Sequence, residues 1–153
     1  MADTSVQGKV ERWIVQHELS RVFEGRGFSK RRVALTWGGA FEFDAVSADG
    51  DIVACVSTSC CRTASGRSAI GKFHKLKADA LYLLHTTIAK RRVMVFTDGG
   101  MLAHFERERS RGRFPSANEI ELLLVSLPDE LASELREATR SASFEVSPRT
   151  LAE

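Results

Sequence analysis

Three strand signals follow one another between residues 32 and 57, and this arrangement constrains the fold more than any other feature of the chain. The first covers residues 32–37 and ends at Gly38-Gly39. The second, residues 41–47, alternates between two sets of side chains, and Asp49-Gly50 then gives a tight turn into a third strand at 51–57. Strands joined by such short turns pair antiparallel, so this segment predicts a three-stranded meander.

Helical periodicity lies on both sides of the meander. Residues 6–23 contain no proline and carry apolar side chains on two sides, which predicts a helix packed between other elements. One stripe consists of Val15, Leu19 and Val22, and the other of Val10, Trp13, Ile14 and His17. A second helix is predicted over about 65–86, with one buried face made of Ala69, Phe73, Leu76, Ala80 and Leu84.

The remaining segment alternates between strand and helix. Residues 92–97 form a short continuous apolar run, as in a central strand buried on both faces. Gly99-Gly100 precedes a short helix, and residues 120–125 predict a fifth strand. Ser126 and Asp129 form a capping box for a last helix over about 127–141, followed by a tail at 142–153.

These elements predict one α/β domain over residues 1–153, with its core in about 6–126 and the order α-β-β-β-α-β-α-β-α. A central mixed sheet would be flanked by helices. The length suits one domain, and a hydrophobic fraction of 43% with 27% charged residues is typical of a globular protein. The chain shows neither a run of roughly 18 apolar residues nor a secretory leader, so we expect a cytoplasmic protein without a membrane partner. We therefore interpret the three cysteines as reduced thiols.

The order of elements and the strand sequences resemble those of the PD-(D/E)XK nucleases and Holliday-junction resolvases, the restriction-endonuclease-like superfamily. Residues 42–46 (EFDAV), the turn Asp49-Gly50 and residues 52–58 (IVACVST) look like the E-x-D, DG and E-V-K-T strand motifs of that family. The resemblance extends from the first helix to the fifth strand, and it also places Glu18 where related proteins often carry a helix glutamate.

In that family, two carboxylates on neighbouring strands hold Mg²⁺ and a nearby lysine orients the attacking water. The resemblance assigns the carboxylate roles to Asp44 and its neighbour Glu42, which could hold Mg²⁺ or Mn²⁺ weakly if at all. The positions of the second carboxylate and the lysine are occupied by Cys55 and Ser57. A thiol is a poor ligand for a hard cation, and a serine hydroxyl carries no charge. Some relatives place the lysine on the following helix, where Lys72 is the candidate.

Basic residues gather in short clusters although the net charge is only +2. The most extended cluster is the alternating series Arg107, Arg109, Arg111 and Arg113. Such residues can contact phosphates, so this series is the predicted nucleic-acid-binding segment.

A second motif indicates different chemistry. Residues 61–68 fit the pattern C-x5-R-[ST] of cysteine-dependent phosphatases, at a point where a strand gives way to a helix. In such a loop Cys61 would attack as a thiolate, while Arg67 and backbone amides would hold the phosphate.

Three functions therefore fit the sequence. The preferred one is a degenerate nuclease-like domain that binds nucleic acid or a protein partner without standard Mg²⁺-dependent cleavage, as a monomer or a homodimer. The second is a divergent nuclease that uses Asp44, Glu42, Glu18 and Lys72. The third is a phosphatase that uses the loop between Cys61 and Arg67.

Overall fold

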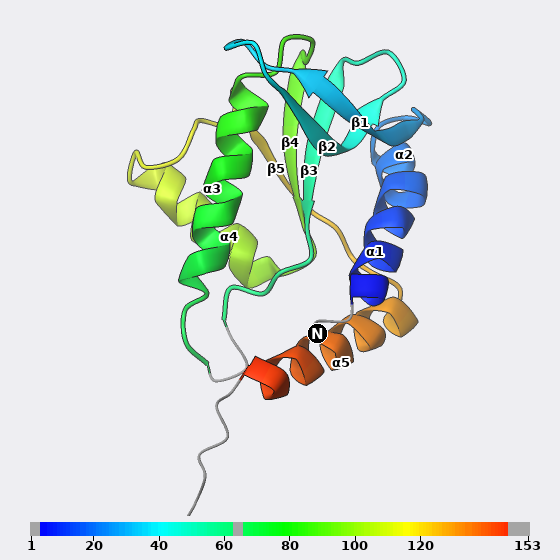
Figure 1. Ribbon diagram of the computed structural model, residues 1–153, viewed down its shortest axis with the longest axis vertical. Helices are drawn as coiled ribbons and strands as arrows, with labels where there is room; N and C mark the ends of the chain where they lie inside the picture. The colour runs from blue at the N-terminus through cyan, green and yellow to red at the C-terminus, as the bar shows by residue number, and fades with distance from the viewer. Residues whose placement is uncertain (1–3, 63–65, 147–153) are drawn as a thin grey trace, which may run out of the picture.

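A five-stranded sheet with the order β1-β2-β3-β4-β5 forms the centre of the molecule (Figure 1). The computed structural model describes residues 4–62 and 66–146. The strands are β1 (Phe28–Ala34), β2 (Ala40–Ser47), β3 (Ile52–Ser57), β4 (Arg91–Phe96) and β5 (Glu121–Leu124). The pairs β1–β2 and β2–β3 are antiparallel, whereas β3–β4 and β4–β5 are parallel. The predicted meander and the α/β class with a mixed sheet are confirmed.

Helices cover both faces of this sheet (Figure 1). Helices α3 (Ile70–Leu84) and α4 (Gly99–Ser110) pack on one face, and α1 (Thr4–Trp13) and α5 (Asp129–Val146) bury their apolar side chains on the other. Along β4, Met94 and Phe96 belong to the core on the α3 side, while Val93 and Val95 belong to the core on the α1 side. The prediction of a strand buried on both faces is therefore confirmed.

The first helix contains a π-helical turn, which explains its two apolar stripes. Between α1 and the short α2 (Leu19–Val22), residues Ile14–Glu18 form the π-helix η1. A π turn contains about one residue more than an α turn, so it rotates the following side chains around the helix axis. As a result Val10, Ile14, Val15 and Leu19, taken from both predicted stripes, are buried in the same core.

The first strand begins four residues earlier than residue 32, where the sequence analysis placed it. It is an edge strand, and residues 29–32 (SKRR) are exposed. The charged side chains that interrupt the apolar pattern therefore remain in water and are not desolvated. Residues 35–37 lie outside the strand, although Leu35 still forms an isolated bridge with Thr86.

Two further boundaries differ from the predictions. Helix α3 starts at Ile70 and not at about residue 65 as predicted: residues 66–69 are not helical, and residue 65 lies outside the described residues. Helix α5 runs to Val146, so residues 142–146 are helical and not part of a tail. Its first turn begins with the hydrogen bond from the Ala132 amide to the Pro128 carbonyl. No helix in the described part of the chain is long and apolar enough to cross a membrane.

Candidate functional site

Asp44 lies at a bulge in β2. The pairs Ser29–Val46 and Arg31–Phe43 enclose one residue of β1 but two residues of β2, so Lys30 faces both Asp44 and Ala45. On its other side, β2 pairs with β3 through Ala45–Ala54 and Val46–Val53. Directly beyond these pairs, the Val56 amide donates a 2.8 Å hydrogen bond to Oδ2 of Asp44. The carboxylate thus takes the place that a backbone carbonyl would have in the ladder.

Asp44 also forms part of the wall of a recess of about 310 Å³, which we call the Asp44 recess. Its other walls come from α1, η1 and the start of β1. The lining residues are Gly8, Glu11, Arg12, Val15, Gln16, Phe28, Ser29, Lys30 and Asp44. The recess therefore opens beside α1 and contains charges of both signs.

Carboxyl groups from three different elements interact electrostatically near this point. The pKa of Glu11 on α1 is raised, mainly by burial and then by Asp44. The pKa of Asp79 on α3 is also raised, again mainly by burial; Asp44 adds to this shift and Lys75 opposes it. Lys75 likewise opposes the rise in the pKa of Glu11. Glu11, Asp44, Asp79 and Lys75 therefore form one charged cluster around the end of the β2–β3 ladder.

The two motif positions on β3 are buried and uncharged. Cys55 is 4% exposed in the core on the α3 side, and burial, followed by Asp79 and Asp44, raises the pKa of its thiol well above the usual value. A protonated thiol binds a metal ion poorly and is a weak nucleophile. Ser57 is 6% exposed, and its hydroxyl accepts a 3.3 Å hydrogen bond from the Ser59 amide. Neither side chain supplies a charge.

The bulge changes the expected relation between Asp44 and Cys55. Regular alternation along both strands predicts that these side chains share one face of the sheet. Cys55 packs toward α3, whereas Asp44 bonds to the β3 backbone and borders the recess beside α1. The alternation does not continue across the bulge, since two residues of β2 there face one residue of β1.

The other predicted members of the nuclease site lie apart from Asp44. Glu42 is exposed and faces Arg32 across the β1–β2 ladder. Glu18 lies in η1 and forms an ion pair with Arg21. Lys72 is exposed near the start of α3, where its charge partly opposes the rise in the pKa of Cys60 that burial causes.

The side chains that do approach Asp44 were missed by the sequence analysis. Glu11 lies on the first helix and Asp79 directly precedes Ala80, a member of the buried stripe of α3. The spacing of four residues between Lys75 and Asp79 indicates a charge pair on one face of a helix, but no signal in the sequence connects this pair with Glu11 or Asp44.

The predicted arginine series divides into two groups. Arg109 donates to the carbonyls of Pro115 and Ile120, and Arg113 lies 3.4 Å from the Glu108 carboxylate. These two side chains thus stabilise α4 and the segment between α4 and β5. Arg107 and Arg111 are exposed and remain available to a ligand.

The two ends of the phosphatase-like loop are held by contacts of Cys61, Arg62 and Ser68. Residues 63–65, in its middle, lie outside the described part of the chain. At its ends, Arg62 and Ser68 form a bridge, and the Cys61 amide donates a 3.0 Å hydrogen bond to the Asp98 carboxylate. The charge of Asp98 also raises the pKa of the neighbouring Cys60, after the larger effect of burial.

No family model, curated protein or solved structure matches this chain. Among residues 4–62 and 66–146, no group of three or more His, Cys, Asp or Glu side chains could hold a metal ion. Asp44 shares its recess with Glu11, and not with Glu42. The described side chains around Asp44, as they are placed, therefore do not fit the Mg²⁺ site that the resemblance implies.

Proposed function

We propose that this protein is a nuclease-like domain of the PD-(D/E)XK type that binds nucleic acid without standard Mg²⁺-dependent cleavage. The observation that best supports this proposal is the state of β3. Cys55 and Ser57, at the positions where the family's second carboxylate and lysine are expected, are buried and neutral. The side chains around Asp44 offer no metal-binding group among the described residues.

Exposed cations beside the Asp44 recess suit binding of the phosphate backbone. Lys30 lines the recess, and Arg32 lies two residues further along β1. Residues two apart on a strand point to the same face, so both cations extend on the side where the recess opens. Such contacts give affinity for nucleic acid of any sequence, and this affinity falls as salt is added.

The binding proposal is tested by fluorescence anisotropy with labelled DNA and RNA over a series of salt concentrations. The variant Lys30→Ala/Arg32→Ala should reduce the slope of log K against log salt by about two, because each lost phosphate contact removes about one. Arg107→Ala/Arg111→Ala is the comparison variant; a smaller slope there would place the nucleic acid on α4. Salt-independent binding of the wild type, or an unchanged slope in both folded variants, would contradict the proposal.

The absence of cleavage is tested with supercoiled plasmid and branched DNA in the presence of Mg²⁺ or Mn²⁺. We expect no nicking by the wild type above the background of an Asp44→Ala variant. Nicking that is lost in Asp44→Ala would show that the protein is an active nuclease.

A divergent active nuclease is the second candidate, and the electrostatic interactions that link Asp44 with Glu11 and Asp79, and Lys75 with both of these carboxyl groups, favour it. These residues would then replace Glu42, Glu18 and Lys72 in the predicted site. Under this alternative, Asp79→Asn and Lys75→Ala would each abolish nicking, whereas Glu42→Gln and Lys72→Ala would leave it unchanged.

A further inference from the structure

A larger cavity, of about 580 Å³, lies beyond the carboxyl ends of the three parallel strands. Thr58 follows β3, Thr97 follows β4 and Val125 follows β5, and all three line this cavity. Helix α5 crosses this end of the sheet and forms the opposite wall (Figure 1). The carboxyl end of parallel strands is where open α/β sheets commonly bind ligands, and the volume suits a small molecule. The cavity shares no lining residue with the Asp44 recess.

The walls between β5 and α5 are apolar. Leu124, Val125 and Leu127 contribute from the strand side, and Leu135 contributes from the helix. Leu124 is 46% exposed, although it is a large hydrophobic residue at the end of a strand. A ligand with an apolar body would remove this surface from water.

Three arginines give the same cavity a positive charge. Arg62 comes from the loop after β3, and Arg136 and Arg140 lie on α5. Arg62 donates to the Gly66 carbonyl at 2.9 Å and Arg136 to the Ser133 hydroxyl at 3.3 Å. Both acceptors are neutral, so these bonds do not compensate the guanidinium charges, and no ion pair with another described residue does.

The carboxylate that lines the cavity, Asp98, already accepts hydrogen bonds from two backbone amides. Oδ2 of Asp98 accepts hydrogen bonds from the amides of Cys61 at 3.0 Å and Met101 at 2.9 Å. Asp98 thereby caps α4 and anchors the loop after β3. Among the described lining residues, three positively charged arginines outnumber this single carboxylate, so the net charge of the cavity wall is positive and favours an anion.

We propose that this cavity binds a small anionic amphiphile, in which a carboxylate or phosphate head contacts the arginines and an apolar body lies against Leu124, Leu127 and Leu135. The arginines are exposed at the rim, and the leucines form the apolar part of the wall. Arginine forms paired, charge-assisted hydrogen bonds with either type of head group. This inference does not rest on nucleic-acid binding, since the cations involved belong to different elements.

The test is a calorimetric titration of the full-length protein with four ligands that share one chain length. Decanoate and decyl phosphate carry an anionic head, decanol a neutral one and decyltrimethylammonium a cationic one. We expect the two anions to bind, and the stronger of them identifies the head group. The alcohol should bind more weakly than either anion, and the cation should not bind. Amide NMR shifts should change at Thr97 and Val125.

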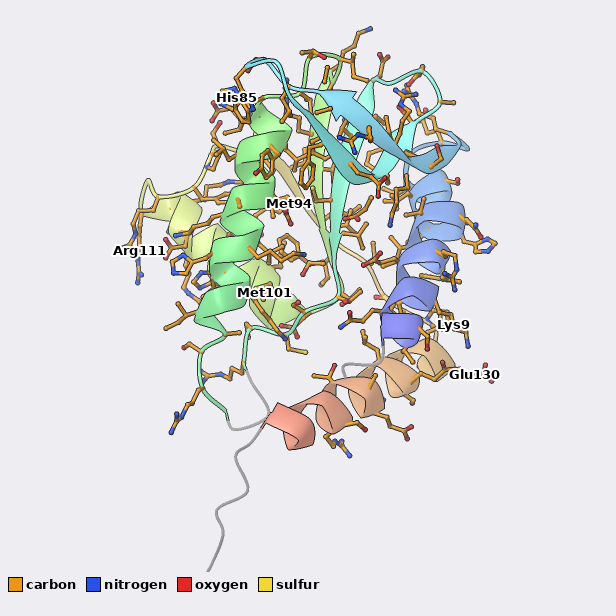
Figure 2. All side chains as sticks on the ribbon, viewed as in Figure 1. Lys9, His85, Met94, Met101, Arg111 and Glu130 are labelled. Carbon is orange, nitrogen blue, oxygen red and sulfur yellow. The ribbon has the colours of Figure 1, made fainter. Side chains whose placement is uncertain are left out.

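Variants then test the role of the arginines. Arg136→Gln/Arg140→Gln should weaken binding of the preferred anion by about tenfold or more, through loss of charge-assisted contacts. Arg111→Gln is the matched control, because Arg111 is an exposed arginine directly after α4, well away from α5 (Figure 2). The proposal is overturned if neither anion binds, if the cation binds as well as the anions, or if the double variant binds as the wild type does. An equal loss in Arg111→Gln would also overturn it, by indicating a general charge effect.

Discussion

The carboxyl group of Asp79 is partly buried on α3, close enough to Asp44 for the two charges to interact. Its raised pKa means that the folded state binds the proton more tightly than the unfolded state does. Ionisation of Asp79 therefore reduces the stability of the fold, and this penalty develops as the pH rises through the folded pKa. At neutral pH the chain retains a side chain that costs stability, as residues at functional sites often do.

Removing this charge should stabilise the protein. We expect Asp79→Asn to raise the melting temperature at neutral pH, with a gain that shrinks as the pH falls toward the range in which wild-type Asp79 is protonated. Thermal unfolding at a series of pH values measures the difference. Glu106→Gln, an exposed change on α4, controls for surface charge. A gain from Asp79→Asn that is independent of pH would contradict this account.

At the scale of elements, the side chain of Arg109 links α4 to the loop that follows it. Arg109 donates a 2.8 Å hydrogen bond to the Pro115 carbonyl and a second bond to the Ile120 carbonyl. Its guanidinium carbon lies 5.7 Å from the centre of the Phe114 ring. These contacts fix the segment that leads from α4 into β5.

Replacement of Arg109 should therefore affect stability rather than nucleic-acid binding alone. Arg109→Ala should lower the free energy of unfolding by roughly 2–4 kcal/mol, because two hydrogen bonds to a charged group are lost. Arg111→Ala should change it by less than about 0.5 kcal/mol, as is usual for exposed sites. Urea denaturation distinguishes the two, and equal effects would show that the Arg109 contacts add no stability.

Sequence patterns predicted the interior elements better than those at the edge of the sheet. Strand β4 is buried on both faces, so its side chains had to be apolar whichever way they point. Strand β1 has one open edge, and most of its residues are exposed, so charged side chains at 30–32 concealed the strand. The spacing of apolar residues along the sequence reflects which side chains are buried, so it predicts an element poorly when most of that element is exposed.

At the scale of the whole molecule, the candidate site was only partly predictable, for a related reason. Asp44, Cys55 and Ser57 were chosen because their strands resemble the motif strands of the PD-(D/E)XK nucleases, and this resemblance said nothing of the helices around them. Glu11 and Asp79 approach Asp44 from helices on opposite faces of the sheet. The bulge in β2 sets this meeting point, and no local sequence pattern encodes it.

The core on the α3 side depends on an aromatic cluster centred on Phe105. This fully buried ring contacts Phe73 of α3, Phe96 of β4 and Phe114 of the loop after α4, with centroid distances of 6.4, 5.8 and 5.1 Å. One side chain thus joins two helices, a central strand and a loop. Loss of this ring would loosen contacts between several elements at once.

Phe105→Ala should lower the free energy of unfolding by roughly 3–5 kcal/mol, the usual cost of removing a buried aromatic ring. Domains of this size are stable by only about 5–15 kcal/mol, so the variant should be close to unfolding at moderate temperature. Phe105→Leu should lose less. Trp37→Ala removes a ring that is 52% exposed, and a comparable loss there would argue against the central role of Phe105.

The π turn in the first helix makes this part of the chain tolerant of a deletion. Removal of one residue from a regular helix rotates its two halves by about 100° relative to each other. Removal of the exposed Gln16 should instead convert η1 into an ordinary α turn, because Val10, Ile14 and Leu19 would then have helical spacing. We expect this shortened protein to fold with nearly unchanged secondary structure by circular dichroism. Deletion of the exposed Ala78 from α3 should instead disrupt folding.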